Sequence, residues 1–307
     1  MLDSAQTIVT QIFIMFLLML VGHLLYRRRI IDSQGSQQLS SLLLNIVTPA
    51  VLITSFQRPF APGEAKMLAT AFFFALLSYV PAILLARLLY GRSPAPYAKD
   101  AQMCLIFSNN GFMALPLLEA LLGSTGVFLG SAGIVTGPVL AWTYGARMLS
   151  GESRVNFKKI LLNPGTLALI GGLLLFCSPW KLPMPVFRAV EYLGSLNTPL
   201  AMLVLGIYLS QSHVLACLKD KTVYLLSVLK LAVIPLLAMA LLYLLGASEL
   251  VATALLIGTA APSGVISAMM AQMFGTDHLF STRIIAVTTL FSAVTMPLFL
   301  LVLQLLW

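Results

Sequence analysis

Two polar interruptions lie inside otherwise apolar segments of this chain. The first holds Ser108, Asn109, Asn110 and Gly111 with Pro116 behind them, and the second holds Pro262, Ser263, Gly264 and Val265 with Ser267 behind them. Glycine relaxes a helix and proline removes one of its N–H donors. A helix broken in this way has free N–H groups at one new end and free carbonyls at the other, which suit an anion and a cation respectively. The pattern therefore predicts ion binding.

The side chains of the interruptions add further polar groups. A lone glycine or proline in a membrane helix can serve close packing only. The adjacent amides of Asn109 and Asn110 differ, because unpaired amides are costly in hydrocarbon and must face protein, water or ligand. These amides can donate to an anion, and nearby serines add hydroxyls. The substrate site that we predict comprises Ser108, Asn109, Asn110, Gly111, Pro262, Ser263, Gly264 and Val265, with Pro116 and Ser267 at the crossover.

A related pattern of asparagine, threonine and proline occurs in two other segments. It consists of Asn45 and Thr48 before Pro49, and of Asn197 and Thr198 before Pro199. Proline should kink each helix and free a carbonyl one turn back. Either these groups line the site from the opposite wall, which makes Asn45 and Thr48 candidate substrate ligands, or the Asn and Thr side chains satisfy the kink themselves.

Lys230 is an ionisable residue inside an apolar segment. It lies about 8 residues from the segment's start, which is about 12 Å deep at 1.5 Å per residue. Such a residue suggests function by default. It can balance the charge of a substrate, bind the carbonyl end of a broken helix, or extend toward the membrane surface. No metal-ligand spacing or catalytic motif occurs, so no cofactor and no metal are predicted, and the coupling ion, H⁺ or Na⁺ if there is one, is left open.

The composition requires lipid around this chain. The sequence is 59% hydrophobic and 9% charged, with a mean hydropathy of +0.97, whereas soluble domains carry about 25% charged residues. A spanning helix needs about 20 apolar residues. We predict an all-α integral membrane protein whose ten spans lie at roughly 7–26, 37–57, 67–90, 101–121, 127–149, 159–178, 187–210, 222–245, 250–273 and 281–305.

The distribution of positive charge predicts the orientation. The formal net charge is +8, and the basic residues concentrate in loops that follow odd-numbered spans, most clearly at 27–29. Cytoplasmic loops carry an excess of Lys and Arg, so both termini are expected outside the cytoplasm. The charge therefore indicates topology and no nucleic-acid partner.

Several landmarks recur at a spacing close to half the chain. Thr48 and Pro49 match Thr198 and Pro199, and a second pair sets Asn110 and Gly111 against Ser263 and Gly264. The chain then divides into 1–150 and 151–307, with five spans in each part. Because five is odd, the second part crosses the membrane in the opposite sense. This predicts two inverted repeats, with broken helices 4 and 9 crossing antiparallel near the midplane.

These motifs together resemble the auxin efflux carrier family, which is related to the bile-acid symporters. The matching residues are 44–50, Asn109 with Pro116, 205–208, Lys230 before Pro235, and 262–265. The resemblance implies ten helices. Helices 1, 2, 6 and 7 would form a scaffold that pairs with a second copy through helices 2 and 7, and helices 3–5 and 8–10 would form a moving transport domain. The chain departs from the family at Ser267, where a second crossover proline is expected.

The resemblance also implies a function and a location. We expect a secondary transporter that moves a small organic anion, such as a carboxylate or an auxin-like acid, by an elevator-type motion. The short loop after helix 5 is typical of bacterial members, which places the protein in the inner (plasma) membrane. An anion channel that uses the same crossover as a filter is the main alternative. A membrane-embedded enzyme is a weaker one, since the sequence has no catalytic constellation.

Overall fold

The computed structural model describes residues 2–151, 158, 161–211 and 220–306. In this part of the chain the regular structure is helical, apart from one isolated antiparallel bridge between Ser108 and Ser263. The all-helical prediction is confirmed. The expected loop after the fifth span and the start of the sixth span lie mostly outside the described residues.

The helices follow one another along the chain, with π-helical turns inside four of the apolar segments. The α-helices are α1 (Leu2–Arg27), α2 (Ser33–Leu42), α3 (Thr48–Ser55), α4 (Pro62–Tyr90), α5 (Ala98–Ile106), α6 (Leu115–Leu140), α7 (Ala146–Ser150), α9 (Pro164–Cys177), α10 (Met184–Ser195), α11 (Asn197–Gln211), α13 (Lys221–Val228), α14 (Ile234–Leu244), α15 (Glu249–Ala260), α16 (Val265–Phe274) and α17 (His278–Leu306). The π-helical turns are η1 (Leu43–Val47), η2 (Asn110–Ala114), η3 (Ala141–Gly145) and η4 (Leu229–Val233).

Seven helical runs of the described residues are long and apolar enough to cross a membrane, and α9, α15 and α16 are shorter apolar helices. One of the seven runs, Asn110–Ser150, reverses direction inside α6. Gly123 has a left-handed φ of 58° there, and Asn110 Nδ2 donates to the carbonyl of Gly133 at 3.2 Å. Residues 23 apart on a straight helix would be about 35 Å apart. The two limbs of this run therefore lie side by side.

Three of the π-helical turns precede a proline. η1, η2 and η4 each end two residues before one, at Pro49, Pro116 and Pro235. The proline ring clashes with the carbonyl one turn back. A wider π turn moves that carbonyl away and leaves proline in the first turn of the next helix, where its missing N–H matters least. Pro199 likewise lies in the first turn of α11.

One group of helices packs around α1 and α11. Gly22 faces the backbone of Leu203 and Gly206 faces the backbone of Met19, each so closely that a Cβ would overlap its neighbour. Small residues allow such close approach of membrane helices. In the same group α3 packs against α9 and α10, and α2 packs against α11.

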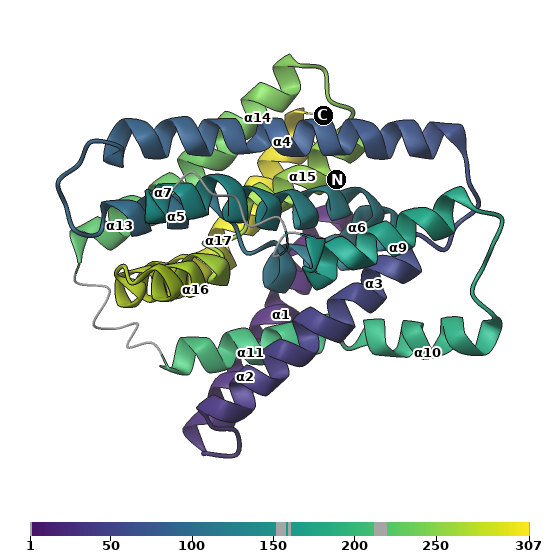
Figure 1. Cartoon of the computed structure of the whole chain (residues 1–307), viewed down its shortest axis with the longest axis horizontal. Helices are drawn as coiled ribbons and strands as arrows, with labels where there is room; N and C mark the ends of the chain where they lie inside the picture. Colours follow the sequence, from purple (N-terminus) through teal and green to yellow (C-terminus); the bar gives the residue numbers. More distant parts are fainter. Residues whose placement is uncertain (1, 152–157, 159–160, 212–219, 307) are drawn as a thin grey trace.

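A second group surrounds α4, which runs across the whole view in Figure 1. α4 contacts α5, α6, α14 and α15, and α17 contacts α13 and α16. Asp100, which is fully buried, joins two parts of this group. Its carboxylate accepts hydrogen bonds from Thr276 Oγ1 at 2.6 Å and from the backbone N–H of Asp277 at 3.1 Å. These bonds hold the start of α5 against the turn between α16 and α17.

Candidate functional site

The chain is unwound at both predicted interruptions. Helical hydrogen bonding stops between α5 and η2, and again between α15 and α16. The two unwound stretches, 107–109 and 261–264, meet as an antiparallel pair, which we call the crossing. The N–H of Asn109 donates to the carbonyl of Pro262, and the N–H of Gly264 donates to the carbonyl of Phe107, both at 2.8 Å. These bonds satisfy backbone groups that the breaks would otherwise leave free.

Hydroxyl groups from the second interruption cap the end of α5. Ser263 Oγ donates to the carbonyl of Cys104 at 2.8 Å, and Ser267 Oγ donates to the carbonyl of Met103 at 3.1 Å. The last carbonyls of a helix lack partners within the helix and carry partial negative charge. Ser263 and Ser267, both predicted from the sequence, thus hold the crossing together and are not among the residues that line the cavity described below.

Lys230 also reaches the carbonyl end of α5. Its side chain is buried, with 1% exposure, and Nζ donates to the carbonyl of Leu105 at 3.1 Å and to Ser108 Oγ at 2.7 Å. Among the described residues no carboxylate lies within 4.0 Å of this nitrogen. An ammonium group has three hydrogens, so one is left after these two contacts. The sequence left three roles open for Lys230. The structure shows one of them, in which the side chain binds the carbonyl end of a broken helix.

Asn109 belongs to the crossing. It is 3% exposed, and its Oδ1 accepts from the backbone N–H of Phe112 at 3.3 Å, which caps the start of η2. Its Nδ2 is buried and has no partner in the part of the chain that is described. One amide donor next to the crossing is therefore unused.

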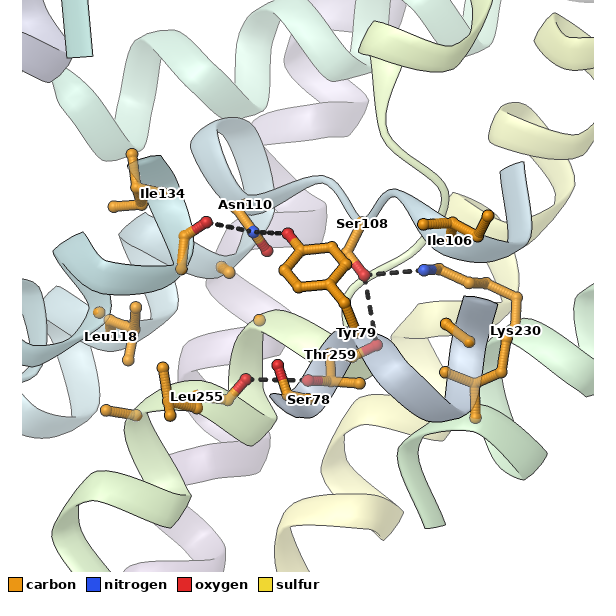
Figure 2. Close-up of a pocket in the computed structure, with 17 residues that line it drawn as sticks. Ser78, Tyr79, Ile106, Ser108, Asn110, Leu118, Ile134, Lys230, Leu255 and Thr259 are labelled. Atoms are coloured by element: carbon orange, nitrogen blue, oxygen red, sulfur yellow. Dashed lines mark hydrogen bonds between the residues drawn. The ribbon is translucent and has the colours of Figure 1, made fainter. Parts of the chain in front are cut away.

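Asn110 points in another direction. Its Nδ2 donates to Tyr79 Oη at 3.4 Å and to the carbonyl of Gly133 at 3.2 Å (Figure 2). Its Oδ1 is buried and unpaired within the described residues. A Cβ built on Gly258 would lie 3.0 Å from this oxygen, so Oδ1 is turned toward α15.

These groups surround a small cavity between α4, α5, α6, α14 and α15 (Figure 2). The cavity offers about 20 Å³ to the centres of water-sized molecules, which is enough for one or two waters. An organic acid enters only if the walls separate. The polar side chains that line the cavity are Ser78, Tyr79, Ser108, Asn110, Lys230 and Thr259.

The other predicted residues lie outside this lining. Gly111, Pro262, Gly264 and Val265 belong to the two interruptions but not to the cavity wall. Asn45 and Thr48 also lie away from the wall, in the helix formed by α2, η1 and α3. Asn45 is exposed, and its Nδ2 donates to the carbonyl of Ser41 at 2.8 Å. The Asn45 side chain therefore bonds within its own helix and does not line the site.

The sequence analysis missed several residues of the cavity wall. Tyr79 supplies a hydroxyl from the middle of α4, two residues before Pro81, and a polar group at that depth is the signal that could have identified it. Gly133 and Gly258 give Asn110 room, and no local pattern marks them. Thr259 lines the wall at the end of α15.

Comparison with known proteins identifies the family. The sequence model of a family described as "Membrane transport protein" matches residues 7–156 and 153–300. The chain belongs to this family. It is the family of the auxin efflux carriers, whose motifs the sequence resembles, and the protein is accordingly an integral membrane transporter.

Two archaeal transporters are similar to this chain over nearly their whole length. An uncharacterized transporter of Methanothermobacter thermautotrophicus is 24% identical and the alignment covers 98% of this chain and 99% of the relative. An uncharacterized transporter of Methanocaldococcus jannaschii is 21% identical, with 94% and 96% covered. The similarity therefore includes both interruptions and the helices around them.

Proposed function

We propose that this protein is a secondary transporter for a small organic anion, which binds in the cavity beside the crossing. The observation that carries the proposal is the environment of Lys230. Its ammonium group is buried, has one hydrogen left over, and has no carboxylate partner among the described residues. Buried charges in proteins are normally paired. A carboxylate that enters the cavity would supply the missing partner.

A second donor supports an anionic ligand. Tyr79 Oη accepts the hydrogen bond from Asn110 Nδ2, and its own hydrogen has no acceptor in the described part of the chain. Tyr79 and Lys230 both line the cavity. A carboxylate accepts two or more hydrogen bonds, and those from charged donors are the stronger ones. Carboxylates, including auxin-like indole acids and small dicarboxylates, are the class that these donors favour.

The proposed mechanism is an elevator-type motion. The helices of the first group, around α1 and α11, would form a fixed scaffold and a dimer contact, and the group around α4 would move with the cavity. In this interpretation the helices make ten spans in two inverted repeats. The antiparallel pairing at the crossing supports that arrangement. The protein would lie in the plasma membrane with both termini outside the cytoplasm.

We propose a carrier in preference to a channel, and the two differ because a carrier's site opens to one side of the membrane at a time. Counterflow into proteoliposomes separates the two. Unlabelled acid inside should stimulate uptake of the labelled acid, and uptake should saturate. Flux that neither saturates nor shows counterflow would indicate a channel instead. We propose no catalytic step, because the family to which the chain belongs is a family of membrane transport proteins.

Lys230→Met tests the site itself. The variant should weaken binding of every transported acid by about tenfold or more, the effect of losing a charge-assisted hydrogen bond. Lys221→Met is the matched control, since Lys221 is exposed at the start of α13 on the same apolar segment. Thermal-shift titration with a panel of organic acids gives the affinities. Equal affinities for the wild type and Lys230→Met would remove the basis of the proposal.

A further inference from the structure

The orientation of the Asn110 amide is determined by its neighbours. Its nitrogen lies 3.2 Å from the carbonyl of Gly133, which can only accept a hydrogen bond. Turning the amide over would place two acceptor oxygens against each other. The nitrogen therefore faces α6, and Oδ1 faces Gly258 on the cavity wall. Toward the cavity, Asn110 is an acceptor.

This acceptor has no donor in the part of the chain that is described. A buried acceptor without a partner is rare in native structures and points to a bound water or ligand. Gly258 packs close to the oxygen, because a Cβ there would lie only 3.0 Å from Oδ1. A hydrogen-bond donor on a ligand would satisfy Oδ1 once the walls separate to admit the ligand.

The cavity therefore has two unlike walls. Lys230 offers a positive donor on one side, and Asn110 Oδ1 offers a partial negative acceptor on the other (Figure 2). A ligand with acceptors only, such as fully ionised malonate, would satisfy Lys230 but would place oxygen against oxygen at Asn110. A ligand with a carboxylate and a hydroxyl or N–H group satisfies both walls.

We propose that the transported anion carries a hydroxyl or N–H hydrogen, which donates to Asn110 Oδ1 while the carboxylate faces Lys230. This inference rests on the proposed function and narrows its substrate class. Hydroxy acids and indole acids fit, and dicarboxylates that have only acceptors do not. The hydrogen-bond donor is the feature by which the site distinguishes among carboxylates of similar size.

Matched ligand pairs test the inference on the unmodified protein. Indole-3-acetate and benzofuran-3-acetate have nearly the same shape, but the second has an oxygen in place of the N–H. Glycolate and fluoroacetate form a small pair, in which fluorine replaces the hydroxyl. For a pair that binds, the member with the donor should bind about tenfold or more tightly, because its isostere leaves a buried acceptor unpaired. Affinities come from calorimetry on the full-length protein in lipid nanodiscs.

A variant tests whether Asn110 is the residue that causes the difference in affinity within each pair. Asn110→Leu removes the acceptor and should bring the affinity ratio within each pair close to one. Gln304→Leu, the same kind of change at an exposed position near the end of α17, should keep the wild-type ratio. A ratio that persists in Asn110→Leu would overturn the assignment of Oδ1.

The possible failures are distinguishable. If the acids bind and binding depends on Lys230, but the two members of each pair bind equally, then water satisfies Asn110 Oδ1 and the inference is wrong while the proposed function stands. If no acid binds, or if Lys230→Met binds as well as the wild type, the proposed function fails and the inference fails with it.

Discussion

Gly264→Ala is the substitution that should disturb the backbone contact at the crossing most directly. A Cβ built at this position lies 2.7 Å from the carbonyl oxygen of Ser108 and 3.0 Å from its carbonyl carbon. Both neighbours are backbone atoms, so no flexible side chain can move aside. An ordinary contact is about 3.4 Å or more, and the two stretches must therefore separate by roughly 0.7 Å at this point.

The separation acts on the two backbone hydrogen bonds of the crossing. Those of Gly264 to Phe107 and of Asn109 to Pro262 are both 2.8 Å long, and a lengthening of roughly 0.7 Å takes them beyond useful geometry. Each bond contributes about 1 kcal/mol net, and a buried partner left unpaired costs about 1–3 kcal/mol. We therefore expect a loss of about 2–4 kcal/mol of stability. In a chain of this size that lowers Tm by on the order of 3–6 °C.

Thermal unfolding of the purified protein measures this effect. Gly171→Ala is the matched control, because nothing lies within 4 Å of a Cβ at Gly171 in α9 and alanine favours a helix more than glycine does. Its Tm should equal or slightly exceed that of the wild type. If Gly264→Ala unfolded within about 1 °C of the wild type, the crossing would not have the close backbone contact described here.

Three further predictions concern packing, capping and binding. Gly206→Ala should lower Tm by several degrees, because its Cβ would overlap the backbone of α1. Ser263→Ala should lower the free energy of unfolding by about 1–3 kcal/mol, which is more than Ser267→Ala should, because the carbonyl that Ser267 contacts also accepts a hydrogen bond from a backbone N–H. Equal Tm values for the two variants would contradict this. Gly258→Ala should weaken binding of the acids several-fold with little change in Tm, since its Cβ would crowd Asn110 Oδ1, and unchanged affinity would show that this oxygen does not meet the ligand.

Local sequence predicted where the helices break, since breaking depends on residues close together in the chain. Glycine and proline act on their own turn, and the unwound stretches fall where these residues occur with asparagine and serine. The composition likewise predicted a helical membrane protein. The number of ten spans stays a prediction. The ninth expected span is divided into α15 and α16, and the sixth is the 14-residue helix α9. The fourth and fifth share the single run Asn110–Ser150, so length and composition alone identify seven long runs among the described residues.

The sequence did not reveal which polar atoms face the cavity, because those atoms are oriented by partners far away in the chain. The sequence made Ser263 a candidate ligand and Ser267 a residue of the crossover. In the structure the carbonyl end of α5 needs donors, and the crossing brings both hydroxyls within reach of it. Asn45 has Ser41 one turn away and bonds there. A pattern along the chain shows which groups need partners, while the fold decides which of them find one inside the protein.

The two neighbouring asparagines show this distinction most clearly. By sequence Asn109 and Asn110 are equivalent donors for an anion. In the structure Asn109 uses its oxygen to cap η2 and leaves Nδ2 unpaired, whereas Asn110 uses its nitrogen on Gly133 and leaves Oδ1 unpaired. One residue therefore keeps a donor and the other an acceptor. Asn110→Asp keeps the acceptor but replaces the donor that holds it in place, so this variant should lose affinity for carboxylates through charge repulsion, while Asn110→Leu should lose mainly the discrimination between matched ligands. Equal effects of the two substitutions on both properties would show that the amide orientation does not govern recognition.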